Sequence, residues 1–314
     1  MSALFTIILP VFLVIGFGYF VSWRGWFSEG AVDGLMRFAQ NFAVPTLLFA
    51  SMARLDLGTE FRPTLLVAFY SGAMASYAVG WAGARFLFDR PPADCVAIGF
   101  VCLFSNTLLL GVPITERAFG SAALDGNWAI IALHSPALYT FGITAMEFTR
   151  ARGSGLAVGH VTLRALSGVL RTPLVIGIAL GLAMNLSMLA GLVMPEGFWA
   201  AVDMIARSAL PAALFGLGGV LYRYRPEGDM ATIAMCCACS LLLHPAITFG
   251  MAHLLSLDVA GTRSAVVTAA MAPGINAYVF ASIYGTARRV AASSVLIGTA
   301  ASVLSTWLWL AVLP

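Results

Sequence analysis

Two stretches of the chain combine an asparagine with residues that interrupt a helix. The first runs from Asn106 and Thr107 to Pro113, and the second contains Pro273, Gly274, Asn276 and Tyr278. An asparagine amide both donates and accepts hydrogen bonds. A proline or glycine interruption divides a helix, and the new half-helix N-terminus carries unpaired N–H groups and the positive end of the dipole. We therefore expect these seven residues to bind a small anion, although an asparagine in an apolar helix also serves as a contact between helices.

Composition places these stretches in a membrane. Of 314 residues, 60% are hydrophobic and 10% are charged, and the mean hydropathy is +0.92, so we expect an all-α polytopic membrane protein. Apolar stretches separated by charged residues predict ten transmembrane helices. They cover residues 2–22, 31–52, 63–86, 93–115, 126–147, 172–192, 198–221, 230–255, 262–284 and 290–312. No basic residue precedes the first stretch, so we expect a retained span and not a signal peptide.

A seven-residue segment occurs twice. Ala43–Phe49 returns as Ala209–Phe215, 166 residues later, with Pro45 and Pro211 at matching places. A proline in an apolar span is unfavourable unless neighbouring protein satisfies the opened backbone, so its recurrence indicates duplication. We expect both prolines to bend their helices. Residues 1–149 then form a first five-helix repeat and residues 172–314 a second. A cytosolic interfacial helix over 150–171 is expected to join them.

The arginines indicate how the helices are oriented. With both termini outside, the cytosolic loops hold eleven arginines and the outer loops hold four, which is the bias expected of membrane proteins. Five helices, an odd number, make the second repeat enter the membrane from the opposite face. The sequence therefore predicts an inverted 5+5 repeat, in which the interrupted fourth and ninth helices are equivalent.

These motifs resemble those of the auxin efflux carrier family, which includes plant auxin exporters and bacterial malonate or malate permeases. The resemblance covers the whole chain. It rests on Asn106-Thr107 with Gly111-Val112-Pro113, on Pro-Gly-x-Asn-Ala in the ninth helix, and on Pro-x-x-Leu-Phe in the second and seventh. It implies a fold related to bile-acid-symporter-like carriers, with a scaffold of spans 1, 2, 6 and 7 and a moving, elevator-type transport unit of spans 3–5 and 8–10.

The resemblance also implies where the substrate binds. Helices 4 and 9 cross at their broken centres in such proteins, and the crossing carries an organic anion. Asn106, Pro113, Pro273 and Asn276 match the crossover positions. The plant carriers place an acidic residue in the third span, where this chain has only Ser71, Ser76 and Tyr77 as polar candidates, and this departure weakens an assignment to auxin.

Charged and titratable residues within the spans are further candidates. Arg207, four residues before Pro211, either binds a substrate carboxylate bidentately or has a structural role, in which it pairs with Asp203 on the same helix face or extends to the membrane interface. His134 and His244 either couple transport to protons or serve as buried helix contacts. Coupling to H+, coupling to Na+ and uniport all stay open.

No cofactor or metal is expected. Cys236, Cys237 and Cys239 have no nearby His or carboxylate in sequence, and small thiols at lipid depth are typical packing residues. We expect the partners to be a small organic anion, the lipid bilayer and a second copy of the chain through the scaffold, and no nucleic acid.

Together these features favour a secondary active transporter or uniporter of small organic anions, such as malonate, malate or auxin-like acids. It would work by alternating access in the plasma membrane, the inner membrane of a bacterium. An anion channel is an alternative, although paired broken helices suit a carrier better. An intramembrane enzyme is a weaker alternative, because no nucleophile and base or metal-binding motif is found, and no catalytic residue is expected.

Overall fold

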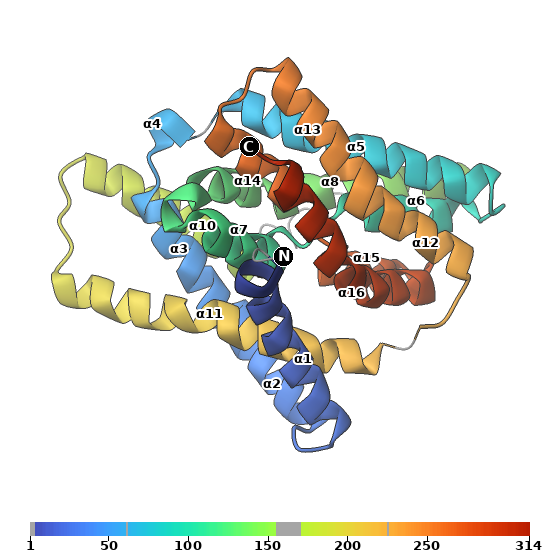
Figure 1. The fold of residues 1–314 in the computed structure, drawn as a ribbon, viewed down its shortest axis with the longest axis horizontal. Helices are drawn as coiled ribbons and strands as arrows, with labels where there is room; N and C mark the ends of the chain where they lie inside the picture. The colour runs from blue at the N-terminus through green and yellow to red at the C-terminus, as the bar shows by residue number, and fades with distance from the viewer. Residues whose placement is uncertain (1–3, 61, 155–170, 225) are drawn as a thin grey trace.

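The chain is built from helices joined by short loops. This computed structural model describes residues 4–60, 62–154, 171–224 and 226–314 (Figure 1). Within them, six helical segments are long and apolar enough to cross a membrane, and three shorter helices are also apolar. The expected linker over 150–171 falls largely on residues 155–170, which lie outside the described part. The helix before it continues to Ser154, past the expected end of the fifth span at residue 147.

The helical elements follow one another in this order: η1 (Leu4–Ile8), α1 (Leu9–Trp23), α2 (Glu29–Phe38), η2 (Ala39–Ala43), α3 (Val44–Arg54), α4 (Leu57–Glu60), α5 (Pro63–Phe86), α6 (Pro92–Leu103), η3 (Thr107–Gly111), α7 (Val112–Phe119), η4 (Ser121–Leu124), α8 (Asp125–Ser154), α10 (Pro173–Leu189), α11 (Glu196–Arg223), α12 (Met230–Ala238), η5 (Cys239–Leu243), α13 (His244–Leu254), α14 (Val259–Ala269), α15 (Ile275–Tyr284) and α16 (Arg288–Val312).

Four of these elements, η1, η2, η3 and η5, are π-helical turns that end two residues before a proline. The prolines are Pro10, Pro45, Pro113 and Pro245. Proline has no N–H to donate and its ring clashes with the carbonyl four residues earlier, so the helix widens to the i→i+5 pattern ahead of it. Pro211 instead lies inside the continuous α-helix α11. Pro45 and Pro211, which we expected to act alike, are therefore accommodated differently.

Helices α1, α2, α3, α10 and α11 pack together into a group that we call the frame. Helix α11 packs along α1, α2 and α3, and α10 packs along α3. The closest approaches are backbone to backbone. A Cβ atom on Gly18 would lie 2.0 Å from the carbonyl oxygen of Phe215, and one on Gly181 would lie 2.6 Å from that of Phe49. Phe49 and Phe215 are the last residues of the repeated segment, so both halves use the same contact.

Polar contacts also join the two halves within the frame. Arg54 at the end of α3 makes a bidentate ion pair with Asp203 of α11, at 2.8 and 3.0 Å. Arg223 at the end of α11 pairs with Asp33 of α2 at 2.7 Å. The Nδ2 atom of buried Asn185, on α10, lies 2.8–3.1 Å from the last carbonyl oxygens of α3 and of Leu55, and so caps that helix end.

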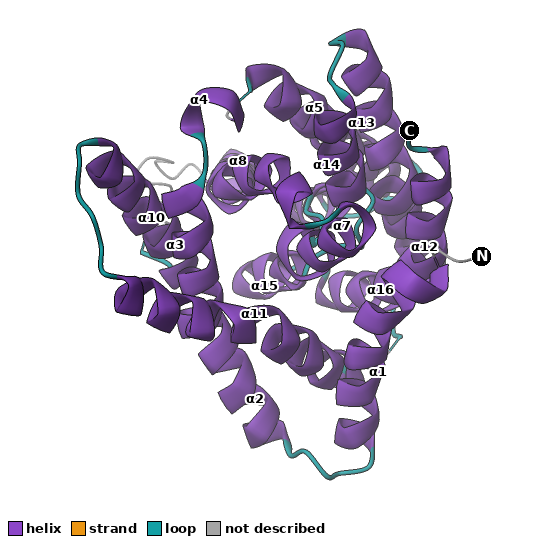
Figure 2. Ribbon diagram, turned by 60° about the vertical axis from the view of Figure 1, so that its left-hand side comes forward, coloured by secondary structure: helices purple, strands orange, loops and turns teal. Residues whose placement is uncertain are grey.

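The remaining long helices, α5 to α8 and α12 to α16, form a second group that we call the crossover bundle. In Figure 2 the frame runs along one side of the molecule, from α10 and α3 through α11 to α2 and α1, and the bundle occupies the other side. Helix α5 packs against α6, α13 and α14, and α16 packs against α12 and α15.

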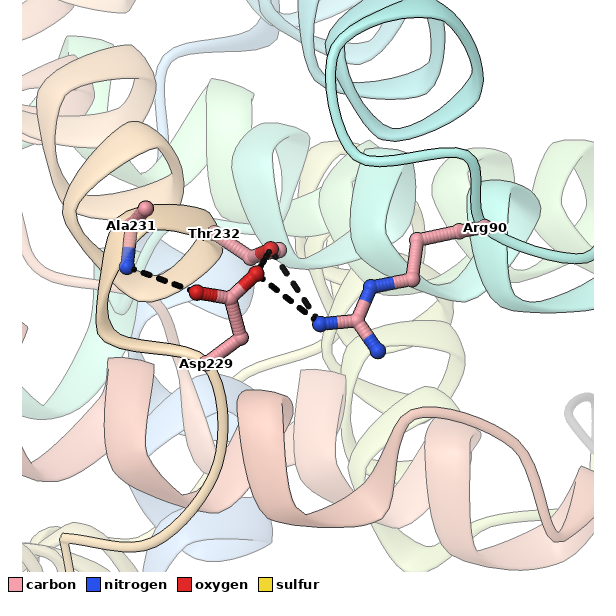
Figure 3. A network of polar contacts seen from close by, with 4 residues as sticks. All are labelled: Arg90, Asp229, Ala231 and Thr232. Atoms are coloured by element: carbon pink, nitrogen blue, oxygen red, sulfur yellow. Dashed lines mark hydrogen bonds and ion pairs between the residues drawn. The ribbon is translucent and has the colours of Figure 1, made fainter.

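Two ion pairs fasten the bundle where its helices begin. Before α6, Arg90 reaches Asp229, which precedes α12, at 3.0 Å (Figure 3). Asp229 also accepts from the Ala231 N–H and the Thr232 hydroxyl and thereby caps α12. Before α5, Arg62 pairs with Asp258, the cap of α14, at 2.8 Å. In both pairs the arginine comes from residues 1–149 and the aspartate from residues 172–314.

The frame and the bundle meet through apolar side chains. A buried cluster joins Val44 and Leu48 of α3 and Ala209 of α11 to Val112 of α7 and Ile131 of α8. The six ion pairs between described residues all lie within the frame or within the bundle. The contact between the groups is therefore mainly apolar, with two hydrogen bonds from Arg117 of α7 to the Thr6 and Ile7 carbonyls of η1, the turn that continues into α1.

Candidate functional site

The two interrupted helices of the bundle meet at their interruptions. Helix α6 ends at Leu103, and the following residues run extended beside the segment between α14 and α15, with Ser105 opposite Pro273 in an antiparallel bridge. The Asn106 N–H donates to the Ala272 carbonyl and the Gly274 N–H donates to the Phe104 carbonyl, both at 2.8 Å. The two breaks thus satisfy part of each other's backbone within the protein interior.

Each break is followed by a helix N-terminus. Asn106 caps the helix that runs through η3 into α7, and its Oδ1 atom accepts from the Leu109 N–H at 3.3 Å. Its Nδ2 atom is buried and has no partner among the described residues. Helix α15 begins after Gly274, which has no side chain to cap it. Asn276 lies in its first turn, where its carbonyl accepts from the Tyr139 hydroxyl at 3.1 Å. Unpaired donors and two positive dipole ends therefore converge.

A cavity of about 580 Å³ opens at this crossing, between the frame and the bundle. We call it the first cavity. Its polar lining residues are Gln40, Asn41, Ser105, Asn106, Thr107, His134, Ser135, Tyr139, Thr172, Asn276 and Tyr284. Its other walls are apolar, and include Phe104, Ile131 and Phe280. Among the described residues no Asp, Glu, Lys or Arg belongs to the lining, so the helix ends and amides dominate the electrostatics of this part of the cavity.

Of the two candidate histidines, one lies in this cavity and the other lies behind it. His134 lines the cavity with its Nε2 atom 3.2 Å from the Ser105 carbonyl oxygen, while its Nδ1 atom is buried and has no partner among the described residues. His244 is fully buried outside the cavity lining, and both its ring nitrogens lack a described partner. The Phe69 ring contacts both imidazoles, at centroid distances of 5.7 and 5.0 Å.

The other expected site residues lie elsewhere. Pro273 takes part in the backbone bridge, and Tyr278 packs on Tyr224 with ring centroids 4.8 Å apart, outside the first cavity. Pro113, Arg207 and Pro211 line a second cavity of about 890 Å³. Pro45 is buried in α3, where its carbonyl faces Gly177.

Arg207 does not pair with Asp203, which was one form of its expected structural role. Asp203 is engaged bidentately by Arg54 of α3 instead. The spacing of four residues along one helix is right for a contact, but a guanidinium from the neighbouring helix offers two parallel hydrogen bonds. In the same way Asp33 pairs with Arg223 rather than with Arg37.

Sequence reasoning missed a polar contact that supports the crossing. Asn127 of α8 is fully buried, and its Nδ2 atom donates to the Thr115 hydroxyl at 3.0 Å and to the Thr268 hydroxyl at 2.8 Å. It thereby ties α8 to the half-helices on either side of the crossing. The only sequence feature that could have indicated this contact is the position of Asn127, an asparagine near the start of an apolar helix. The five cysteines are buried and unpaired, and no group of three metal-binding side chains occurs in the described residues.

An all-helical membrane protein whose interrupted helices cross beside a polar cavity has the features of a membrane transporter. The chain matches the family model described as membrane transport protein over residues 3–310. It belongs to this family, the auxin efflux carrier family, which is a family of transporters and not of enzymes.

Several curated proteins are similar to the chain. "Uncharacterized transporter YfdV" of Escherichia coli (strain K12) is 22% identical over 96% of this chain and 95% of its own length. "Putative malonate transporter" of Rhizobium meliloti (strain 1021) is 23% identical over 96% and 93%. "Probable auxin efflux carrier component 3b" of Oryza sativa subsp. japonica is 29% identical over 46% of this chain and 25% of its own length.

Proposed function

We propose that this transporter carries small organic anions of the carboxylate class and binds them in the first cavity. The observation that carries the proposal is the convergence of two helix N-termini, with Asn106 and Asn276, on a cavity whose described lining contains no acidic residue. Helix N-termini bind carboxylates through free N–H groups and the positive dipole end. We choose malonate as a test substrate because one relative is named a putative malonate transporter. Auxin-like acids are chosen because another is named a probable auxin efflux carrier component.

The proposed architecture is ten spans in an inverted 5+5 repeat, with the frame as scaffold and the crossover bundle as the moving unit. Three features support it. The glycine contacts at Phe49 and Phe215 correspond between the halves. In such a repeat the two end ion pairs of the bundle would correspond, with their charges exchanged. The two cavities are distinct and residues of one apolar cluster line both, an arrangement that suits alternating access better than an open channel.

Orientation, coupling and assembly extend this proposal. The arginine bias supports a multi-pass protein of the plasma membrane with both termini outside, so the first cavity would open to the cytosol. His134 and His244 have no described carboxylate partner to hold a proton, and the described lining of the first cavity offers no carboxylate for Na+. We therefore favour uniport driven by the membrane potential. A homodimer through the frame stays a prediction.

The direct test is ligand-dependent thermal stabilisation of the purified protein. Malonate, malate, acetate, benzoate and indole-3-acetate are each added to the wild type, to Asn106→Ala and to Asn276→Ala. Thr144→Ala is the matched control, because Thr144 lies on the exposed side of α8 outside the cavity lining. We expect one or more acids to raise the Tm of the wild type and the control.

In both asparagine variants that shift should be lost or reduced about tenfold in apparent affinity, because each variant removes an amide donor worth about 1.4 kcal/mol to a bound carboxylate. A shift retained in both variants would place the anion elsewhere. The absence of any shift in the wild type would count against carboxylates as the substrate class.

A further inference from the structure

The second cavity shares the apolar cluster with the first: Val44 and Ile131 of the cluster line the first cavity, and Leu124 and Trp128 line the second. On the frame side it is lined from α1, α3 and α11, and on the bundle side from α7, η4 and α8. Unlike the described lining of the first cavity, its lining contains charged residues, which are Arg54, Glu116, Arg117, Asp125, Asp203 and Arg207. Both cavities therefore open between the same two groups of helices, but they offer an anion different chemistry.

At one pair of matching positions, the frame presents a polar residue to each cavity. Asn41 lies four residues before Pro45 and lines the first cavity, and Arg207 lies four residues before Pro211 and lines the second. Both side chains are exposed. The repeated segment thus places an amide at one cavity and a guanidinium at the other.

Among the arginines of the second cavity, Arg207 is the one with its donors available. Arg54 is held bidentately by Asp203. Arg117 donates to the Thr6 and Ile7 carbonyls, at 2.6 and 3.2 Å. Arg207 makes no hydrogen bond or ion pair with the described residues and interacts with Asp203 only through its charge. The two acids not engaged by Arg54, Glu116 and Asp125, lie on the bundle side of the cavity.

We propose that Arg207 is an anion-binding residue of the second cavity, which receives the substrate carboxylate when the bundle brings the crossing to that side. The inference rests on the proposed function and adds a site to it. Guanidinium binds a carboxylate with two parallel, charge-assisted hydrogen bonds, which are roughly twice as strong as neutral ones. The amide of Asn41, at the matching position in the first cavity, offers the anion only neutral hydrogen bonds. The transporter therefore binds its anion more tightly from the second cavity than from the first.

The test measures KM separately from each face, in right-side-out and inside-out membrane vesicles, with radiolabelled malonate and radiolabelled indole-3-acetate as probes. In Arg207→Gln we expect KM from the face of the second cavity to rise about tenfold, while KM from the face of the first changes less than twofold. Arg207→Lys should lie between wild type and Arg207→Gln. Arg37→Gln is the matched control, because Arg37 is an exposed frame arginine that lines neither cavity, and both KM values should stay as in wild type.

The mirror variant sharpens the test. Asn41→Arg places a guanidinium in the first cavity, and we expect KM from that face to fall about tenfold. The Tm of each variant shows that it is folded. If wild type transports a probe but Arg207→Gln leaves the ratio of the two KM values unchanged, Arg207 is not an anion-binding residue and the proposed function stands. If wild type transports neither probe, the proposed function fails and this inference fails with it.

Discussion

The frame and the crossover bundle are each held together internally by ion pairs and close backbone contacts, whereas they meet mainly through apolar side chains and through two hydrogen bonds from Arg117 of α7 to the Thr6 and Ile7 carbonyls ahead of α1. In the frame, helices of the two halves touch backbone to backbone at Gly18 and Gly181, and ion pairs fix both ends. In the bundle, interrupted backbones pair with each other and buried Asn127 joins three helices. Between them lies an apolar cluster, and no ion pair of the described residues crosses it. Hydrogen bonds and ion pairs depend on direction, so they resist sliding more than apolar contacts do. The comparison therefore indicates that the frame and the bundle are each rigid and can move against each other at their mainly apolar interface.

The largest expected effect comes from breaking the frame at its closest contact. Gly18→Ala would put a methyl group 2.0 Å from the Phe215 carbonyl oxygen, and backbone cannot give way as a flexible side chain can. Helices α1 and α11 must separate, and we expect a loss of about 3 kcal/mol of stability, measured as a fall in Tm. The matched control is Gly16→Ala, two residues away on α1, where a methyl group meets nothing within 4 Å. An equal fall in both variants would contradict the packing described for the frame.

A smaller effect is expected from Asn185→Leu, which keeps the side chain's approximate size. The substitution leaves the carbonyls of Met52, Ala53 and Leu55 without the amide that caps α3. We expect a loss of about 2 kcal/mol, because buried acceptors are then unsatisfied. Ser187→Ala on the same helix removes only an exposed hydroxyl bonded within its own turn and should change stability by less than about 0.5 kcal/mol. A thermal melt of both variants in one detergent decides between these outcomes.

The smallest effect concerns the end of the bundle and depends on pH. The Thr232 hydroxyl, the Ala231 N–H and the Arg90 guanidinium hold the pKa of Asp229 below its ordinary value. A carboxyl with a depressed folded-state pKa stabilises the fold fully above its unfolded pKa, about 4, and loses this contribution as pH falls through the folded value. Asp229→Asn should therefore lower Tm modestly at pH 7, and the difference from wild type should vanish in acid.

Asp89→Asn provides the control for this pH series. Its side chain is 96% exposed, in an i,i+4 pair with Arg85 at 3.2 Å, and exposed pairs contribute little. We expect its Tm to follow that of wild type at every pH. A difference for Asp229→Asn that grows as the pH falls would mean that the ion pair does not stabilise the folded bundle.

The sequence indicated the helical class, the family and the places where two helices are interrupted, because apolar composition and clustered Asn, Gly and Pro are local signals. It did not indicate the partners of charged residues. Asp203 and Asp33 pair with arginines of other helices, and such contacts depend on packing between segments that are distant in sequence. It also missed the π-helical turns, although all four precede a proline, and the capping role of Asn185.

The site was predictable to a similar extent. Asn106, Thr107, Gly274 and Asn276 lie together at the first cavity, as expected of breaks in two equivalent helices, but their binding of an anion stays a prediction. Tyr278 faces Tyr224 instead, because its direction is set by the helical phase of α15 after the break. Ser135 and Phe104 also line the first cavity, but only because the two interrupted helices cross in three dimensions, and no local sequence pattern predicts that.

Movement of the bundle against the frame is tested most directly by counterflow of a radiolabelled carboxylate in proteoliposomes, with the frame and the bundle joined by a disulfide. One cysteine is placed on η3 and one on α11, which pack together. The five native cysteines are buried. A control pair joins α1 to α11 within the frame. We predict that oxidation of the first pair lowers counterflow at least tenfold, that a reductant restores it, and that the control pair leaves it unchanged. Full counterflow with the first disulfide formed would contradict movement of the bundle against the frame.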